Sequence, residues 1–95
     1  MIKRKEKILN LPSGKFKIRA LNMFDFIEAG ADRASKEDVR ANAQIMKRLI
    51  MRAVVEPPLV DDPRAENSIY SLSNDEINTI FNEIMKLSGL EANFL

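Results

Sequence analysis

The segment KILNLPSGKFKIRAL, residues 7–21, has the pattern of a β-hairpin. Pro12, Ser13 and Gly14 suit a tight turn, because proline restricts φ and glycine accepts a positive φ. In the returning strand apolar and basic residues alternate, so one face is apolar and the other is basic. The apolar side carries Phe16, Ile18 and Ala20, and the basic side carries Lys15, Lys17 and Arg19. Two strands alone are only marginally stable, so we expect helices to cover the apolar face.

Three helices are predicted after the hairpin, at residues 22–30, 36–55 and 74–88. Asn22 is the expected N-cap of the first helix, and Gly30 is its expected end. Ser35 is expected to cap the second helix, which two consecutive prolines end. Ser73 and Glu76 have the spacing of a capping box at the start of the third helix. The predicted fold class is therefore α+β: an N-terminal β-hairpin packed on about three α-helices, mostly helical.

The predicted elements fit into one domain, since 95 residues are too few for two hydrophobic cores. We expect a single domain over residues 1–95. Between the second and third helices, residues 56–67 are predicted to be a loop and residues 69–72 a brief extended segment. Residues 91–95 are predicted to be a short tail.

The composition excludes many kinds of site. Cysteine and histidine are both absent, which removes thiol chemistry, the commonest general base and the commonest metal ligand. Neither a Gly-rich phosphate loop nor a Ser-x-x-Lys motif occurs. We therefore expect a protein that is not an enzyme and uses no cofactor or metal. We also expect a soluble intracellular protein, because no apolar run approaches the ~20 residues of a membrane span and no signal core follows the basic start.

Charge is divided unevenly along the chain. Residues 1–55 hold thirteen basic and six acidic residues, a net charge of +7, and residues 56–95 hold two basic and eight acidic residues, a net charge of −6. Such asymmetry suits a nucleic-acid face, two halves that attract each other, or copies that meet head to tail. A nucleic-acid face is disfavoured, because the basic residues are spread over several elements and aromatic residues that could stack on bases are not interleaved with them.

A surplus of apolar residues suggests a protein-binding surface. The apolar positions of the 36–55 helix spread over about half of its circumference, which is wider than a surface helix needs. Met is well suited to irregular apolar partners. The candidate partner-binding residues are Ile45, Arg48, Leu49, Met51, Arg52, Phe94 and Leu95. The alternative is that the core absorbs the whole arc and that Met51 is one of the scattered apolar residues found on every surface.

Three segments together resemble the small tail assembly chaperones of long-tailed bacteriophages. LPSGK at residues 11–15, followed by KIR at 17–19, is similar to the opening of that family. VVEPP at 54–58 is similar to the end of its main helix, and IYSLSNDEINTIFNEIMKLSGL at 69–90 is similar to its closing helix. The resemblance rests on the order and spacing of the segments and covers residues 9–90.

The resemblance implies a non-enzymatic assembly factor that binds the tape measure protein, keeps it soluble and helps recruit the major tail protein. In this family the recruitment often depends on a longer product made by ribosomal frameshifting. Self-association is expected from the opposed charges of the two halves, which would stack copies along the tape measure protein. The resemblance also implies action in the cytoplasm of the infected bacterial host and absence from the mature virion. The alternatives are a small nucleic-acid-binding regulator that uses the basic half, and a structural head–tail connector subunit.

Overall fold

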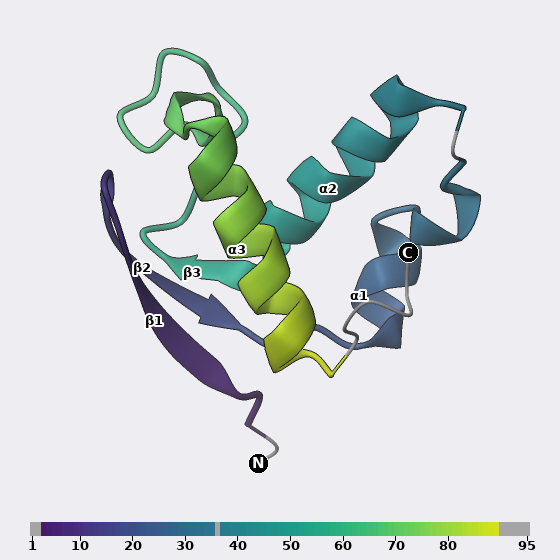
Figure 1. Cartoon of the computed structure of the whole chain (residues 1–95), viewed down its shortest axis with the longest axis horizontal. Helices are drawn as coiled ribbons and strands as arrows, with labels where there is room; N and C mark the ends of the chain where they lie inside the picture. The colour runs from purple at the N-terminus through teal and green to yellow at the C-terminus, as the bar shows by residue number, and fades with distance from the viewer. Residues whose placement is uncertain (1–2, 36, 90–95) are drawn as a thin grey trace.

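The computed structural model describes residues 3–35 and 37–89. Within them the chain forms a three-stranded sheet and three α-helices, which confirms the predicted α+β class (Figure 1). The strands are β1 (Glu6–Leu11), β2 (Gly14–Arg19) and β3 (Val54–Glu56). The helices are α1 (Met23–Glu28), α2 (Val39–Ala53) and α3 (Asn74–Leu87), with short 3-10 helices η1 (Ala31–Arg33) and η2 (Ile69–Ser71). The predicted tail, with Phe94 and Leu95, lies outside the described residues.

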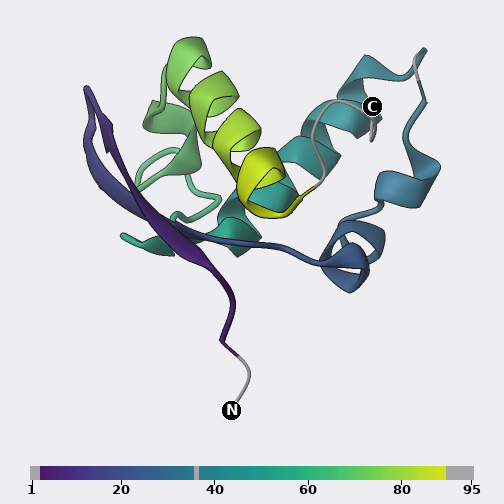
Figure 2. The same ribbon diagram turned by 60° about the horizontal axis from the view of Figure 1, so that its bottom comes forward.

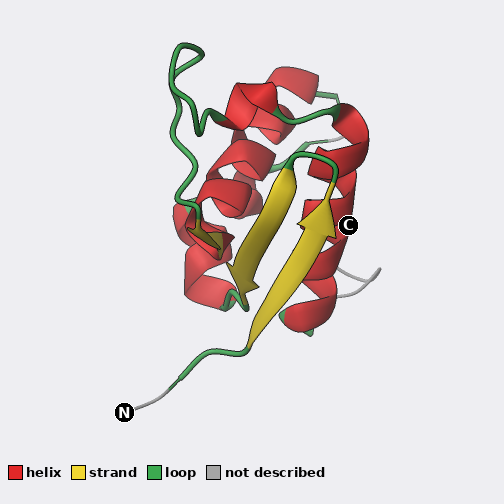
Figure 3. Ribbon diagram, turned by 90° about the vertical axis from the view of Figure 1, so that its left-hand side faces the viewer, coloured by secondary structure: helices red, strands yellow, loops and turns green. Residues whose placement is uncertain are grey.

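The predicted hairpin is confirmed. Strands β1 and β2 are antiparallel, and Leu11 pairs with Gly14 across a turn of two residues. Gly14 has a φ of +135°, a backbone conformation that favours glycine. Phe16 and Ile18 are buried, as their alternation predicts, and the helices lie on one face of the sheet (Figure 3). The hairpin therefore forms one wall of the core.

The boundaries predicted for the 36–55 helix are wrong at both ends. The carboxylate of Asp38, not Ser35, accepts the cap hydrogen bond, from the amide of Ala41 at 2.9 Å. Helix α2 ends at Ala53, and the next three residues form β3, which is antiparallel to β2. β-Branched residues favour strands, and the exposed edge of β2 offers backbone partners that a sequence pattern does not display. The helix therefore changes into a strand before the prolines are reached.

The extended segment predicted at residues 69–72 is also wrong. Residues Ile69–Ser71 form the 3-10 helix η2, whose start is capped by the Ser68 hydroxyl accepting from the amide of Tyr70 at 3.1 Å. Ser68 is itself buried. A local side-chain cap thus overrides the strand preference of the Ile–Tyr pair.

Helix α3 supplies much of the core. It packs on α2, β1 and β2, and its predicted apolar face is buried at Ile80, Phe81, Ile84 and Met85. Its predicted capping box is present: the Ser73 hydroxyl accepts from the amide of Glu76, and the carboxylate of Glu76 accepts from the amide of Ser73.

Glu76 also ties the helix to the hairpin turn. Its carboxylate accepts hydrogen bonds from the amide and the hydroxyl of Ser13, both at 2.9 Å. The bond from the Ser73 amide, followed by those from Ser13, lowers the pKa of Glu76 from 4.5 to about 2. One buried carboxylate therefore joins two elements that are 63 residues apart.

We expect Glu76→Gln to weaken the dependence of stability on acid pH. Because the pKa is lower in the folded chain, ionised Glu76 contributes stability above pH 4.5, and this contribution is lost as the pH falls toward about 2. Urea unfolding midpoints measured at several pH values across this range should fall less steeply in Glu76→Gln than in the wild type. Glu66→Gln, at an exposed position, is the control. Parallel profiles for the wild type and Glu76→Gln would contradict the hydrogen bonds described.

Candidate partner-binding surface

Helix α1 is a six-residue helix that lies beyond the end of β2, away from the hairpin turn (Figures 1 and 2). It begins at a capping box, as Asn22 predicts. The Asn22 side chain accepts from the amide of Asp25 at 3.1 Å, and the Asp25 carboxylate accepts from the amide of Asn22 at 2.9 Å. Phe26 and Asp25 point inward and are buried. These two side chains fix the helix on the rest of the fold.

The Asp25 carboxylate links α1 to two arginines from distant parts of the chain. It lies 2.8 Å from a guanidinium nitrogen of Arg4 and 3.0 Å from one of Arg52. Burial raises the pKa of Asp25, but the hydrogen bond from the Asn22 amide and the two guanidinium groups outweigh it, so the pKa lies below its ordinary value. Asp25 is thus held ionised, and it orients α1 against the end of α2.

The outer face of α1 is apolar and exposed. Met23 is 70% exposed, Phe24 is 72% exposed and Ile27 is 49% exposed. Residues four apart are neighbours on a helix, so Met23 lies beside Ile27, and Phe24 lies beside Glu28. We call Met23, Phe24 and Ile27 the α1 apolar surface. A cluster of large apolar side chains on one short helix differs from the single exposed residues that are normal on protein surfaces.

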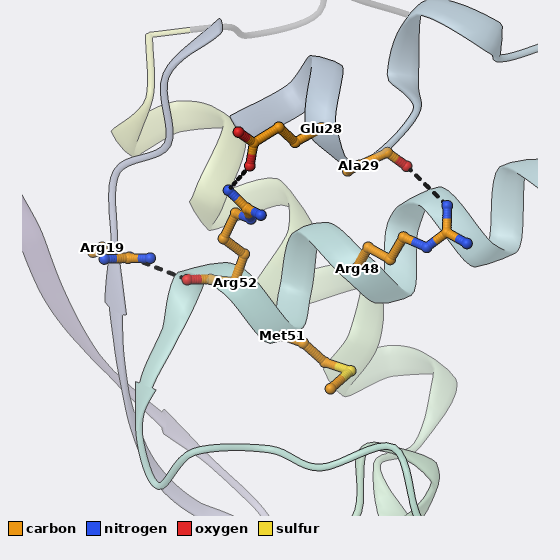
Figure 4. Close-up of a pocket in the computed structure, with 6 residues that line it drawn as sticks. All are labelled: Arg19, Glu28, Ala29, Arg48, Met51 and Arg52. Atoms are coloured by element: carbon orange, nitrogen blue, oxygen red, sulfur yellow. Dashed lines mark hydrogen bonds and ion pairs between the residues drawn. The ribbon is translucent and has the colours of Figure 1, made fainter. Parts of the chain in front are cut away.

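A shallow depression of about 500 Å³ adjoins this helix. We call it the arginine depression; its lining residues are Arg19, Glu28, Ala29, Arg48, Met51 and Arg52. Arg48 and Arg52 reach from α2 toward α1 (Figure 4). Arg52 lies 2.7 Å from the Glu28 carboxylate, and Arg48 donates to the carbonyl oxygen of Ala29 at 3.3 Å. Arg19 donates through Nε to the carbonyl oxygen of Arg52 at 3.1 Å.

The structure brings together three of the residues predicted to bind a partner: Arg48, Met51 and Arg52. The prediction for Leu49 is wrong, because its side chain is only 2% exposed and belongs to the core. Ile45 and Met51 are half-buried and pack against the core. The core thus absorbs more of the α2 arc than the partner-binding hypothesis assumed, because α1, α3 and β3 all pack on α2.

The α1 apolar surface was missed by sequence reasoning, although it carried a usable signal. Met23, Phe24, Phe26 and Ile27 are four of the six residues of α1. A helix this short, with one side turned to the core, cannot bury apolar residues all round its circumference. The apolar side chains of α1 that do not face the core must therefore lie at the surface or be covered by a partner.

Ion pairs connect the basic and acidic halves of the chain. Lys7 lies 2.7 Å from the Glu83 carboxylate, and Lys47 lies 3.1 Å from the Asp61 carboxylate. Lys47 also donates to the hydroxyl of Tyr70 and lies over its ring. Attraction between the two halves therefore occurs inside the molecule, although exposed pairs of this kind contribute little stability.

Comparison of the chain with protein-family models, with curated proteins and with solved structures found no match. Across residues 3–35 and 37–89, no group of three or more carboxylates is arranged to hold a metal ion. In the same part of the chain, no helix has the length and apolar character that crossing a bilayer requires.

Proposed function

We propose that this chain is a non-enzymatic tail assembly chaperone that binds the tape measure protein of a long-tailed bacteriophage and keeps it soluble. The observation that carries the proposal is the α1 apolar surface, where three large side chains are left in solvent. Exposed apolar clusters are typical of binding sites for other proteins, and Met and Phe are enriched in the centres of such sites. The resemblance of residues 9–90 to the chaperone family supplies the kind of partner.

The proposed mechanism is shielding. A long helical protein with an apolar stripe aggregates through that stripe, and a small domain that covers it prevents this. The chaperone then helps to recruit the major tail protein, through a longer product of the same gene where one is made, and copies associate with one another along the tape measure protein. It acts in the cytoplasm of the infected host cell and leaves before the virion is complete.

We expect co-expression of the chain with the tape measure protein of the same phage to give a soluble complex that co-purifies. Phe24→Ser should weaken this complex about 30-fold, because truncating an aromatic residue at the centre of an interface commonly costs about 2 kcal/mol. The recovered complex and its dissociation constant are the measurements.

Ile8→Thr is the matched control, since Ile8 is 60% exposed on β1 and lies outside the α1 apolar surface. It should leave the complex intact. A tape measure protein that stays insoluble beside the wild-type chain would contradict the proposed function. Equal loss of the complex in Ile8→Thr and Phe24→Ser would contradict the choice of surface.

A further inference from the structure

We infer that the α1 apolar surface and the arginine depression form one docking site for an acidic amphipathic helix. The apolar ridge of the partner covers Phe24 and its neighbours, and the carboxylates beside that ridge pair with Arg19 and Arg48. The assignment of this helix to a tape measure protein rests on the proposed function, whereas its charge and shape follow from the site itself.

The apolar and basic parts of the site adjoin each other. Phe24 and Glu28 are neighbours on the outer face of α1, and Glu28 forms one wall of the arginine depression. The Glu28 carboxylate is bonded to Arg52 at 2.7 Å, so its charge is already compensated. A ligand that lies across Phe24 therefore reaches the wall of the arginine depression within one turn of helix.

Among the residues that the structure describes, two positive groups of the site have no carboxylate partner. Arg4 and Arg52 are paired with Asp25 and Glu28. Among the described residues, no carboxylate lies within ion-pair distance of Arg19 or Arg48. Each of these two donates to one backbone carbonyl oxygen. A guanidinium group carries five N–H donors, so both keep donors for a ligand and are held in position to use them.

The shape of the site favours a helix as the ligand. Met23 with Ile27, and Phe24 with Glu28, form two parallel ridges of residues four apart, which is the surface that packs into the grooves of a second helix. The six residues of α1 span about 9 Å, enough to contact about two turns of that helix. Arg19 and Arg48 lie apart in the lining of the arginine depression (Figure 4), so each suits a single carboxylate side chain better than the broad surface of an anionic bilayer.

Two synthetic peptides of equal length test the inference. Both carry the same leucine ridge, and the ridge is flanked by glutamates in one peptide and by lysines in the other. In fluorescence anisotropy at low salt, the wild-type chain should bind the glutamate peptide at least about tenfold more tightly than the lysine peptide. Added salt should reduce this difference.

Variants separate the two parts of the site. Arg48→Gln and Arg19→Gln should each weaken binding of the glutamate peptide by about 3- to 10-fold. Neither variant should weaken binding of the lysine peptide. Phe24→Ser should weaken binding of both peptides. Arg64→Gln, at an exposed loop position, removes the same charge as a control and should have little effect. Circular dichroism and the melting temperature check that each variant is folded.

Equal binding of the two peptides would overturn the inference. So would unchanged binding of the glutamate peptide to folded Arg19→Gln and Arg48→Gln, or tighter binding to phosphatidylserine vesicles than to this peptide. The outcomes for the proposed function are separate. A soluble tape measure complex without preference for the glutamate peptide would leave the function standing and remove the inference. Binding of the glutamate peptide without a tape measure complex would support the inference about the docking site and contradict the proposed function.

Discussion

Replacing Ile80 with alanine should lower the free energy of unfolding by about 2–5 kcal/mol. The side chain is 0% exposed on the buried face of α3, and it belongs to the same core cluster as Ile18 and Ile50. Truncation removes apolar contact and leaves a cavity, because neighbours on a sheet and two helices relax only partly. Since a domain of this size is stable by only about 5–15 kcal/mol, the loss is a large part of the total.

Urea unfolding of the purified variant gives this change directly. Ile8→Ala provides the comparison, because the same atoms are removed at an exposed position on β1, and its cost should stay near 0.5 kcal/mol or below. An Ile80→Ala variant as stable as Ile8→Ala would show that α3 does not pack on the sheet as described.

Leu49→Asp should have a still larger effect and leave most of the chain unfolded. Leu49 is 2% exposed and belongs to a core cluster of apolar side chains, so an aspartate there is a charge buried in apolar surroundings. Such substitutions belong to the rare class that costs more than about 4 kcal/mol. The sequence indicates a partner-facing residue at this position, for which the same change would weaken partner binding more than it lowers the melting temperature.

The melting transition separates these two interpretations. Leu49→Met is the matched variant, and it should cost less than about 1.5 kcal/mol because volume and apolar character are kept. If Leu49→Asp unfolds cooperatively with a melting temperature within a few degrees of the wild type, Leu49 is not buried as described. The residue would then be a candidate for the partner-binding surface again.

The candidate site could be predicted only in part. Arg48, Met51 and Arg52 were assigned to a surface from their place on one helix, and the structure does gather them around one depression. Arg19 and Glu28 join them from β2 and α1. Arg19 and Glu28 lie near the α2 residues because of the way β2, α1 and α2 pack together. The spacing of residues within a single element cannot predict this proximity. The exposed face of α1 could have been anticipated from its composition, but not its position beside the arginines.

Elements that depend on neighbouring residues were evident from the sequence alone. The hairpin turn at Pro12 and Ser13, the cap at Asn22 and the capping box at Ser73 each satisfy backbone groups within a few residues, so a short pattern is enough to specify them. Alternation and helical periodicity likewise identified the buried faces of β2 and α3.

Contacts between distant residues were decided by the tertiary structure. The strand β3 exists because the edge of β2 offers backbone partners to Val54 and Val55, which the local pattern assigns to a helix, and to Glu56. Leu49 is buried because several elements close over α2, and Glu76 binds Ser13 across 63 residues of chain. The energies that favour these arrangements arise from burial and from hydrogen bonds between separate elements, and such terms appear only once those elements are packed together.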